Sequence, residues 1–331
     1  MKQIISMKYL RQFVLPGLSL WLFCVFLVTS SLAAPADFPK KEVSIIVNYG
    51  PGGARDILAR GIGNTMSKYL GVPVVITNIP GAGGARGLIS LYHAAPDGYT
   101  MGLGALADIL SQILEKQDYD CKKFTYIGNA QYAPPVWFVK SDSPIQTVKQ
   151  FDTFGKVVRH SAFSMTSNST VAAMILANRQ GFPLVIVGGY KSAADAILAV
   201  IRGEVEFSSG APCVAVPFMR AGQLRPLLAI GQERVSDFPN TPTIAEAGQT
   251  DLGLLASYYW LMAPPGIPKP HSEILENALM KTLKDPDFLK WAKGAGVDLK
   301  PLSGEETTQM VIKLFGLLEP YKGDMEKYTK Q

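Results

Sequence analysis

Two glycine-rich loops, each between a predicted strand and a predicted helix, constrain this chain more than any other feature of its sequence. One spans residues 50–56 (GPGGARD) and the other residues 80–87 (PGAGGARG). Glycine lets the backbone reach φ > 0 and approach a ligand closely, and the helix that follows points unpaired N–H groups at its loop. The two loops together predict an anion site at the carboxyl ends of the strands, suited to a carboxylate or a phosphate. Glycine turns also join strands to helices for geometric reasons alone, and that purely structural role is the alternative for either loop by itself.

Strand–loop–helix alternation around and beyond these loops predicts an α/β fold. Short apolar runs bounded by turn residues indicate buried strands, and longer segments carry apolar side chains at helical spacing. We expect strands at residues 43–47, 74–76, 100–103, 161–165, 185–187, 203–207 and 225–230, and helices at residues 56–70, 171–179 and 193–202, with another ending at His93. Such alternation favours mostly parallel sheets with helices on their faces.

The length of 331 residues allows about two domains, at a prior of roughly 150 residues each. Residues 263–270 are too rich in proline to form a helix or a central strand, and two or three helices follow. We expect two α/β lobes, the first from residues 37–140 plus 262–331 and the second from residues 141–261, with the final helices packing on the first lobe.

The first 33 residues have the pattern of a secretory signal peptide. Basic residues precede an apolar run at residues 13–28, and small residues then lead to a cleavage site after Ala33. The alternative is an uncleaved anchor, but a membrane span needs roughly 20 apolar residues. Removal of residues 1–33 takes away three basic residues and no acid, so the formal charge falls from +5 to +2. A nearly neutral chain without basic runs excludes a nucleic-acid partner.

Hydroxyl-bearing residues gather before the predicted helix of the second lobe, at residues 164–170 (SMTSNST). Capping of a helix explains one Ser or Thr, which leaves the others free to bind oxygen atoms. Tyr49 and Tyr190 lie at strand ends, as core aromatics or as pocket walls. Arg55 is either a solvated surface residue or a ligand for a carboxylate, and Asp56 is expected to stabilise the helix dipole.

Motifs for catalysis are absent from the sequence. The first loop lacks the Gly-Lys-Ser/Thr ending of an ATP-binding loop, the second has GxGxxxG spacing, and neither GxSxG nor HExxH occurs. His93, His160 and His271 are scattered, and Cys121 and Cys213 are expected to be separate buried thiols. We therefore predict no catalytic residue, no metal ligand, no cofactor and no enzymatic activity.

Short blocks of residues also follow one another in a recognisable order. They are YGPGG at 49–53, PGAGG at 80–84, APDGYT at 95–100, AGQLR at 221–225, PTIAEAG at 242–248, and Trp260 before Ala263-Pro264. As an ordered set they resemble the tripartite tricarboxylate transporter substrate-binding proteins, also called Bug-type receptors. The resemblance covers essentially the whole chain after the signal peptide.

This resemblance implies a two-lobed, periplasmic-binding-protein-like fold of type II that closes on a small organic acid in a cleft between the lobes. In that family the backbone amides of the two loops hold one carboxylate, and a loop of the second lobe, here residues 166–170, contacts the ligand. Thr77 and Ile79 depart from the usual Glu and Arg, and Ala54-Arg55 replaces a small or hydroxylated pair, which bears on the choice of ligand. The expected ligand-binding residues are Tyr49, Gly52, Gly53, Ala54, Arg55, Ala82, Gly83, Gly84, Thr166, Ser167, Ser169, Thr170 and Tyr190.

The expected function is that of a periplasmic, monomeric receptor which captures a small di- or tricarboxylate and delivers it to a membrane permease of two subunits. One alternative is a periplasmic ligand-sensing partner of a membrane sensor kinase. A nucleotide-loop enzyme is another, and a purely structural periplasmic protein is the third.

Overall fold

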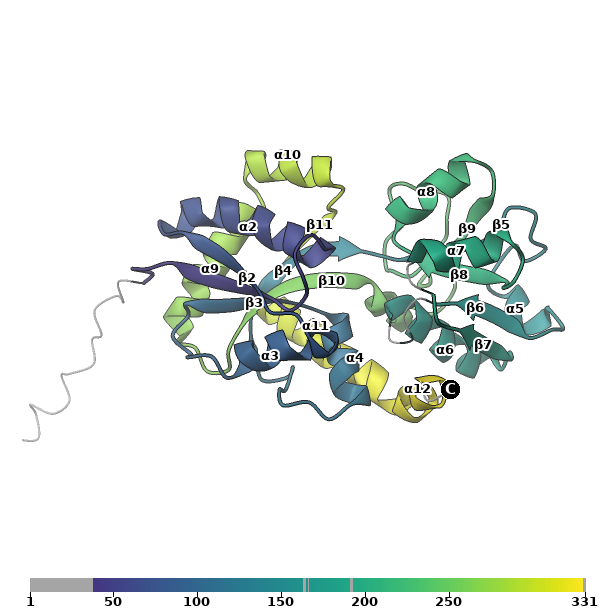
Figure 1. Ribbon diagram of the computed structural model, residues 1–331, viewed down its shortest axis with the longest axis horizontal. Helices are drawn as coiled ribbons and strands as arrows, with labels where there is room; N and C mark the ends of the chain where they lie inside the picture. Colours follow the sequence, from purple (N-terminus) through teal and green to yellow (C-terminus); the bar gives the residue numbers. More distant parts are fainter. Residues whose placement is uncertain (1–37, 163–164, 166, 191–192, 330–331) are drawn as a thin grey trace, which may run out of the picture. The chain divides into compact units, whose positions relative to one another are not determined.

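The computed structural model describes residues 38–162, 165, 167–190 and 193–329. The predicted signal peptide and the predicted site residue Thr166 lie outside these residues. The chain from Pro39 to Gln331 forms one compact unit, and its strands form two separate sheets with helices on their faces (Figure 1). The predicted α/β class is therefore confirmed.

The first sheet has the strand order β11-β4-β10-β3-β1-β2. Its strands are β1 (Val43–Val47), β2 (Val74–Asn78), β3 (Thr100–Ala105), β4 (Thr125–Ala133), β10 (Ser257–Ala263) and β11 (Leu299–Ser303). Strand β1 pairs in parallel with β2 and β3, whereas β10 is antiparallel to β3 and β4, and β11 is antiparallel to β4. The parallel part places the ends of β1 and β2, and so both glycine loops, at one edge of the sheet.

Helix α2 (Ala54–Leu70) shows how the sequence builds the elements around the first loop. Leu58, Ile62 and Met66 recur every four residues and are fully buried, so one apolar stripe faces the sheet. Gly71 ends the helix with φ of 72°, a left-handed conformation that glycine adopts without a Cβ clash. This helix is the predicted one, with its start two residues earlier.

The remaining helices of this half are α3 (Ala85–Tyr92), α4 (Leu106–Leu114), α9 (Lys269–Thr282), α10 (Pro286–Ala295) and α11 (Gly304–Leu318), and α12 (Lys322–Thr329) ends the chain. Helices α9 and α11 pack on β4, and α9 and α10 pack on α2. The predicted return of the final helices to the first sheet is confirmed, although the sequence reading missed β11 between them.

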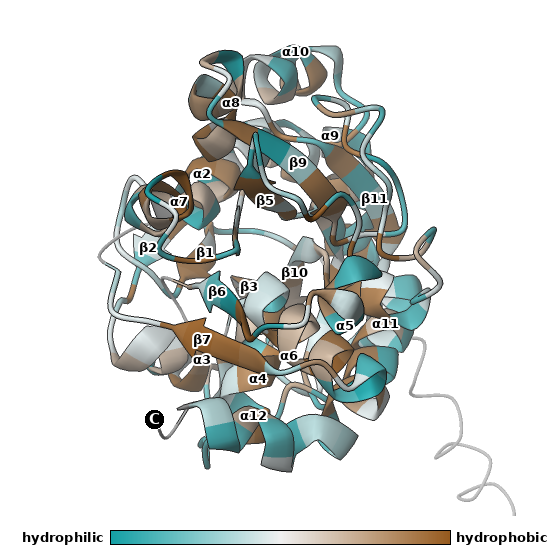
Figure 2. Cartoon of the chain, turned by 90° about the vertical axis from the view of Figure 1, so that its right-hand side faces the viewer, coloured by the Kyte–Doolittle hydropathy of each residue, from teal (hydrophilic) through white to brown (hydrophobic). Residues whose placement is uncertain are grey.

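The second sheet has the order β7-β6-β8-β5-β9. It is built from β5 (Val136–Lys140), β6 (Val158–Ser161), β7 (Leu184–Val187), β8 (Phe207–Gly210) and β9 (Leu224–Ala229), with helices α5 (Gln150–Thr153), α6 (Asn168–Gln180), α7 (Ala193–Ile201) and α8 (Pro212–Arg220). Strand β7, at the sheet edge, is hydrophobic along its length (Figure 2). All pairs are parallel except those of β5 with β8 and β9.

Two predicted strands of this sheet were misplaced. Strand β6 lies mostly before the predicted segment 161–165. It was missed because it contains the charged residue Arg159, which pairs with Glu206 at 2.8 Å. Strand β8 begins at Phe207, not at residue 203, because Gly203 has φ of 74° and starts a turn in which Val205 is nevertheless buried. In the sequence, a buried apolar residue in a turn cannot be told apart from a residue of a buried strand.

The chain passes from the first sheet to the second between Ala133 and Val136 and returns before Ser257. The division into two lobes stays a proposal. Strand pairing favours boundaries near residues 134 and 256 over 140 and 261, because β5 belongs to the second sheet and β10 to the first.

Candidate functional site

The first glycine loop ends in an uncapped helix. Gly53 is the N-cap of α2, with φ of −79° and ψ of 168°, and no side chain accepts a hydrogen bond from the first turn at this cap. The amides of Ala54, Arg55 and Asp56 have no partner within the helix. In the part of the chain that the structure describes, no acceptor faces these amides or that of Gly53. The turn thus presents main-chain donors and the positive end of the helix dipole.

The second loop presents its amides through a strained turn. Residues Ala82–Gly84 form the short 3-10 turn η1, and the Gly84 amide donates to the Gly81 carbonyl at 3.0 Å. Ala82 has φ of 48°, and it alone among the described non-glycine residues has positive φ. Such strain is kept where surrounding structure enforces it, often at binding sites. The amides of Ala82 and Gly83 have no described acceptor.

Side chains at the ends of β1 and β2 hold the two loops together. The Tyr49 hydroxyl donates to the Gly83 carbonyl at 2.9 Å, and the Asn78 side-chain amide donates to the Tyr49 carbonyl at 3.0 Å. A Cβ on Gly84 would lie 2.8 Å from Nδ2 of Asn48, so only glycine fits there. The loops therefore lie side by side as one rigid edge.

Asp56 has the structural role expected of it, and that role extends across both loops. Its carboxylate accepts hydrogen bonds from Nε of Arg60 at 2.9 Å, from the Gly52 amide at 2.9 Å and from Nδ2 of Asn78 at 3.0 Å. These bonds, the one from Arg60 foremost, lower the pKa of Asp56 to about 2.

Internal hydrogen bonds already occupy the amides of two predicted site residues. The amide of Gly52 is already bonded to Asp56, and the amide of Gly84 is bonded to Gly81. Both glycines shape the loops, and their contact with a ligand stays a prediction. The amides without a described partner belong to Gly53, Ala54, Arg55, Asp56, Ala82 and Gly83.

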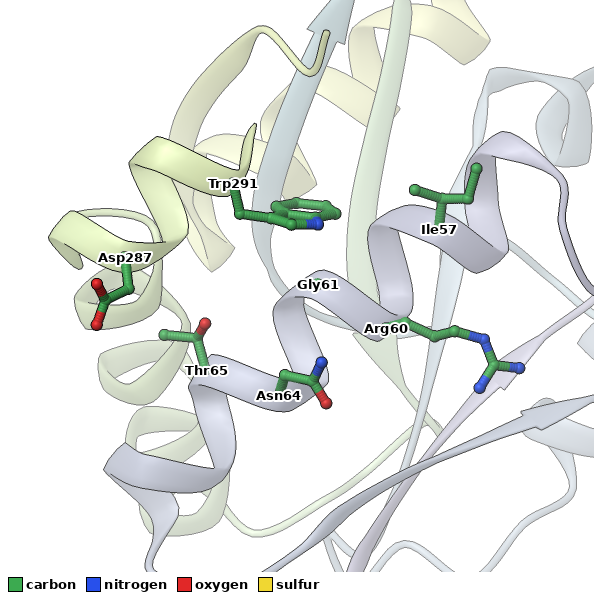
Figure 3. A pocket seen from close by; sticks show the side chains of 7 residues that line it. All are labelled: Ile57, Arg60, Gly61, Asn64, Thr65, Asp287 and Trp291. Carbon is green, nitrogen blue, oxygen red and sulfur yellow. The ribbon is translucent and has the colours of Figure 1, made fainter. Parts of the chain in front are cut away.

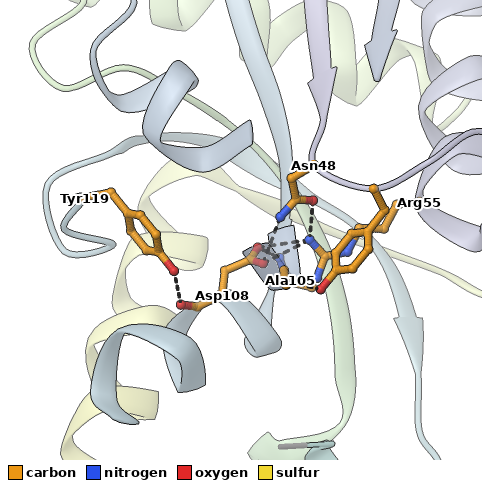
Figure 4. Close-up of polar contacts among 7 residues, drawn as sticks. Asn48, Arg55, Ala105, Asp108 and Tyr119 are labelled. Carbon is orange, nitrogen blue, oxygen red and sulfur yellow. Dashed lines mark hydrogen bonds and ion pairs between the residues drawn. The ribbon is translucent and has the colours of Figure 1, made fainter. Parts of the chain in front are cut away.

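Arg55 is not a surface residue, since only 8% of it is exposed. Its Nη1 donates to Oδ1 of Asn48 at 2.6 Å and to both carboxylate oxygens of Asp108, at 3.0 and 3.2 Å (Figure 4). Burial opposes its charge, but the Asp108 carboxylate keeps the pKa of Arg55 above its ordinary value. The Tyr49 ring lies 4.7 Å from the guanidinium carbon.

Asn48 and Asp108 are site residues that the sequence reading missed. Asn48 follows β1, and Asp108 lies in the first turn of α4, where its Oδ2 accepts from the Ala105 amide at 2.7 Å. The sequence did contain a signal for both residues, because polar residues that directly follow parallel strands gather at one edge of the sheet. An aspartate in a first turn, however, also has a purely structural reading.

In the predicted second-lobe loop, residues 166–170, the described hydroxyl groups form hydrogen bonds within the protein. Ser167 caps α6 by accepting from the Thr170 amide at 3.3 Å. Ser169 and Thr170 are buried: Ser169 donates to Ser209 at 2.6 Å, and the Thr170 hydroxyl lies 2.7 Å from that of Ser167. That they bind ligand oxygen atoms stays a prediction.

Two other residues bear on this loop. Asn168 is half-buried and donates through Nδ2 to the Ser257 hydroxyl at 3.1 Å, so it links the start of α6 to the first residue of β10. Tyr190 packs against the apolar cluster that includes Phe138 and Ile197. Burial raises the pKa of Tyr190, and its role at the site stays a prediction.

A separate hollow of 340 Å³ lies between α2 and α10, walled by Ile57, Arg60, Gly61, Asn64, Thr65, Asp287 and Trp291 (Figure 3). None of these is a predicted site residue. The Trp291 ring lies against Gly61, where a Cβ would come within 2.2 Å of it. We therefore assign this hollow to helix packing and place the candidate site at the loop edge.

The model of the tripartite tricarboxylate transporter family receptor matches residues 58–314. The chain belongs to this receptor family. The UPF0065 protein in the gbd 5′ region of Cupriavidus necator is 31% identical to the receptor over 263 residues, 77% of this chain and 79% of that protein.

Solved structures agree with the fold of the receptor. A TctC solute-binding protein from Polaromonas, without ligand, superposes with a TM-score of 0.76 at 22% identity, over 88% of this chain and 99% of that one. MatC from Rhodopseudomonas palustris with bound malate gives a TM-score of 0.67 at 25% identity, over 86% and 99%. The family of solute-binding receptors is thus established.

Cys121 of the receptor is buried and free, as predicted, and burial raises the pKa of its thiol. Among the residues that the structure covers, no group of three His, Cys, Asp or Glu side chains forms a cation site. No helix in the same residues has the length and apolar character to cross a membrane.

Proposed function

We propose that this receptor works in the periplasm, where it captures a small organic carboxylate and delivers it to a membrane permease of two subunits. The observation that carries the proposal is the cluster of main-chain amides at Gly53, Ala54, Ala82 and Gly83, which have no partner among the described residues. Backbone donors at a helix N-terminus favour a negatively charged oxygen. The malate bound to MatC, which is 25% identical, supports an organic acid as the ligand.

The receptor binds the ligand and does not convert it. Loop amides fix one carboxylate, and Ser167 and Asn168, at the start of α6, contact the face of the ligand turned toward the second lobe when the two lobes close. A ligand that contacts both lobes shifts the population toward a closed state. Export by cleavage of residues 1–33 and action as a monomer belong to this proposal.

Isothermal titration calorimetry with malate, succinate, adipate and citrate tests the proposal, with glucose as a neutral control. We expect at least one acid to bind and glucose to give no heat of binding. Binding of the sugar, or of a divalent cation, with no response to any acid would show that the loop edge is not a carboxylate site.

A further inference from the structure

The guanidinium of Arg55 has one edge to which no described residue is hydrogen-bonded. All its described hydrogen bonds leave from Nη1, toward Asn48 and Asp108. Its Nε and Nη2 have no acceptor among the described residues. These two nitrogens carry parallel N–H groups on the same side of the planar guanidinium, the arrangement that binds a carboxylate through two hydrogen bonds.

This free edge is reachable although the side chain is buried. The Arg55 side chain is 10% exposed. Among the described residues, four side-chain nitrogen or oxygen atoms are inaccessible to solvent and have no hydrogen-bond partner. They are Asn129 Oδ1, Trp137 Nε1, Gln180 Oε1 and Trp260 Nε1. Neither Nε nor Nη2 of Arg55 is among them, so both atoms keep some access to solvent.

The surroundings hold the guanidinium in place before any ligand arrives. Asp108 and Asn48 bind Nη1, and the rings of Tyr49 and Tyr259 lie 4.7 and 5.9 Å from the guanidinium carbon. A donor already fixed in its binding orientation loses little conformational entropy when a ligand binds. Asp108 is therefore a positioning residue, anchored in turn by the Ala105 amide.

The free edge belongs to the side chain of Arg55, whereas the donors of the loops are main-chain amides. Helices α2 and α4 lie on opposite faces of the first sheet (Figure 1), and the Arg55 side chain leaves the start of α2 to reach Asp108 at the start of α4. It therefore crosses the end of β1, and its guanidinium lies several bonds away from the Arg55 amide. A ligand with two anionic groups can therefore place one group at the amides and the other at this edge.

We propose that Arg55 determines specificity by binding a second anionic group of the ligand through its Nε–Nη2 edge, while the loop amides hold the first. This inference rests on the proposed carboxylate site and adds to it a preference for ligands with two anionic groups. Desolvated charge-assisted pairs of this kind exceed a neutral hydrogen bond in strength.

Calorimetry on the full chain and on Arg55→Gln tests this role, with succinate, glutarate and adipate each compared with its own monoamide. The monoamide keeps one carboxylate and the length of the diacid but lacks the second charge. We expect Arg55→Gln to weaken the tightest diacid roughly 10- to 100-fold, and its monoamide by less than about threefold. Arg55→Lys, which has a cation but no fork, should recover only part of the loss.

Two further variants keep the test decisive. Arg55→Gln leaves Asp108 buried without its cation, so the double variant Arg55→Gln/Asp108→Asn removes both charges together, and it should lose the same preference for the diacid. Arg86→Gln is the matched control, because Arg86 lies exposed in the first turn of α3, and it should keep the wild-type ratio.

The outcomes separate the two proposals. If the variants of Arg55 keep the wild-type ratio between diacid and monoamide, the role of Arg55 is wrong while the amide site stands. If the wild-type chain binds no carboxylate at all, both proposals are wrong.

Discussion

The Tyr49 hydroxyl donates a 2.9 Å hydrogen bond to the carbonyl oxygen of Gly83, which fixes the second glycine loop to the end of β1. This bond holds the loop in the turn where Ala82 has φ of 48°. The same Tyr49 ring lies over Arg55. One residue therefore contacts both the second loop and the neighbouring cation.

Tyr49→Phe removes this bond and keeps the ring. Without the hydroxyl the second loop is free to relax its strained turn, so its amides no longer point together at one carboxylate. We expect the affinity for the best acid of the panel to fall roughly fivefold, the value of one net hydrogen bond of about 1 kcal/mol. Calorimetry measures this change; equal affinity in variant and wild type would mean that Tyr49 does not organise the loop.

Gly53→Val should abolish acid binding in a folded protein. Gly53 has φ of −79°, which valine adopts, and a Cβ there meets only the Gly50 carbonyl oxygen, at 3.8 Å. The added side chain would fill the space in front of the amides of α2. Calorimetry and thermal unfolding should show lost binding with the melting temperature retained.

Gly316→Val on α11 is the control for this substitution, since Gly316 is exposed and a Cβ there meets nothing within 4 Å. It should bind the acid as wild type does. An intact affinity in Gly53→Val would place the anion somewhere other than the start of α2.

Asp56 should make stability sensitive to acid over a defined range. Its pKa is about 2 in the folded protein, below the ordinary 3.8, because Arg60 and then the Gly52 amide bind the carboxylate. Its contribution is therefore present above pH 4 and is lost as the pH falls toward 2. Urea unfolding of wild type and Asp56→Asn should differ most above pH 4 and converge near pH 2. A difference that stays constant over this range would contradict the assignment.

His160 should affect the free energy of unfolding over a higher pH range than Asp56 does. Burial, foremost, holds its pKa at about 4, below the ordinary 6.5, although its ring lies 3.4 Å from the Phe207 carbonyl oxygen. The unfolded chain takes up a proton there first, so the free energy of unfolding should fall as the pH drops from 6.5 to 4, by roughly 3 kcal/mol. His160→Gln should show a shallower slope in urea unfolding over this range. Equal slopes would mean that His160 already carries a proton when folded.

The sequence predicted the parallel part of the first sheet well, because its signals are local. Residues 43–47 are bounded by charge and glycine, and α2 ends where Gly71 supplies a left-handed C-cap. Strands β4, β10 and β11 were not predicted, because their pairing joins residues more than 120 positions apart. Turn signals do not report such long-range contacts.

The sequence predicted where the candidate site lies, but not which of its amides stay unpaired. Glycine spacing located both loops, but which amides stay unpaired depends on Asp56 and Gly81 accepting from Gly52 and Gly84. Likewise, the run of hydroxyls before α6 does not reveal that Ser169 turns inward to Ser209. Side-chain direction depends on packing between segments, and spacing along the chain does not determine it.

A crystal structure of the protein with the tightest-binding acid of the panel would show whether the amides of the two glycine loops hold the carboxylate. We predict a carboxylate within hydrogen-bonding distance of the main-chain nitrogens of Gly53 or Ala54 and of Ala82 or Gly83. An acid bound elsewhere, for instance against Trp291 between α2 and α10, with those nitrogens left unbound, would contradict it.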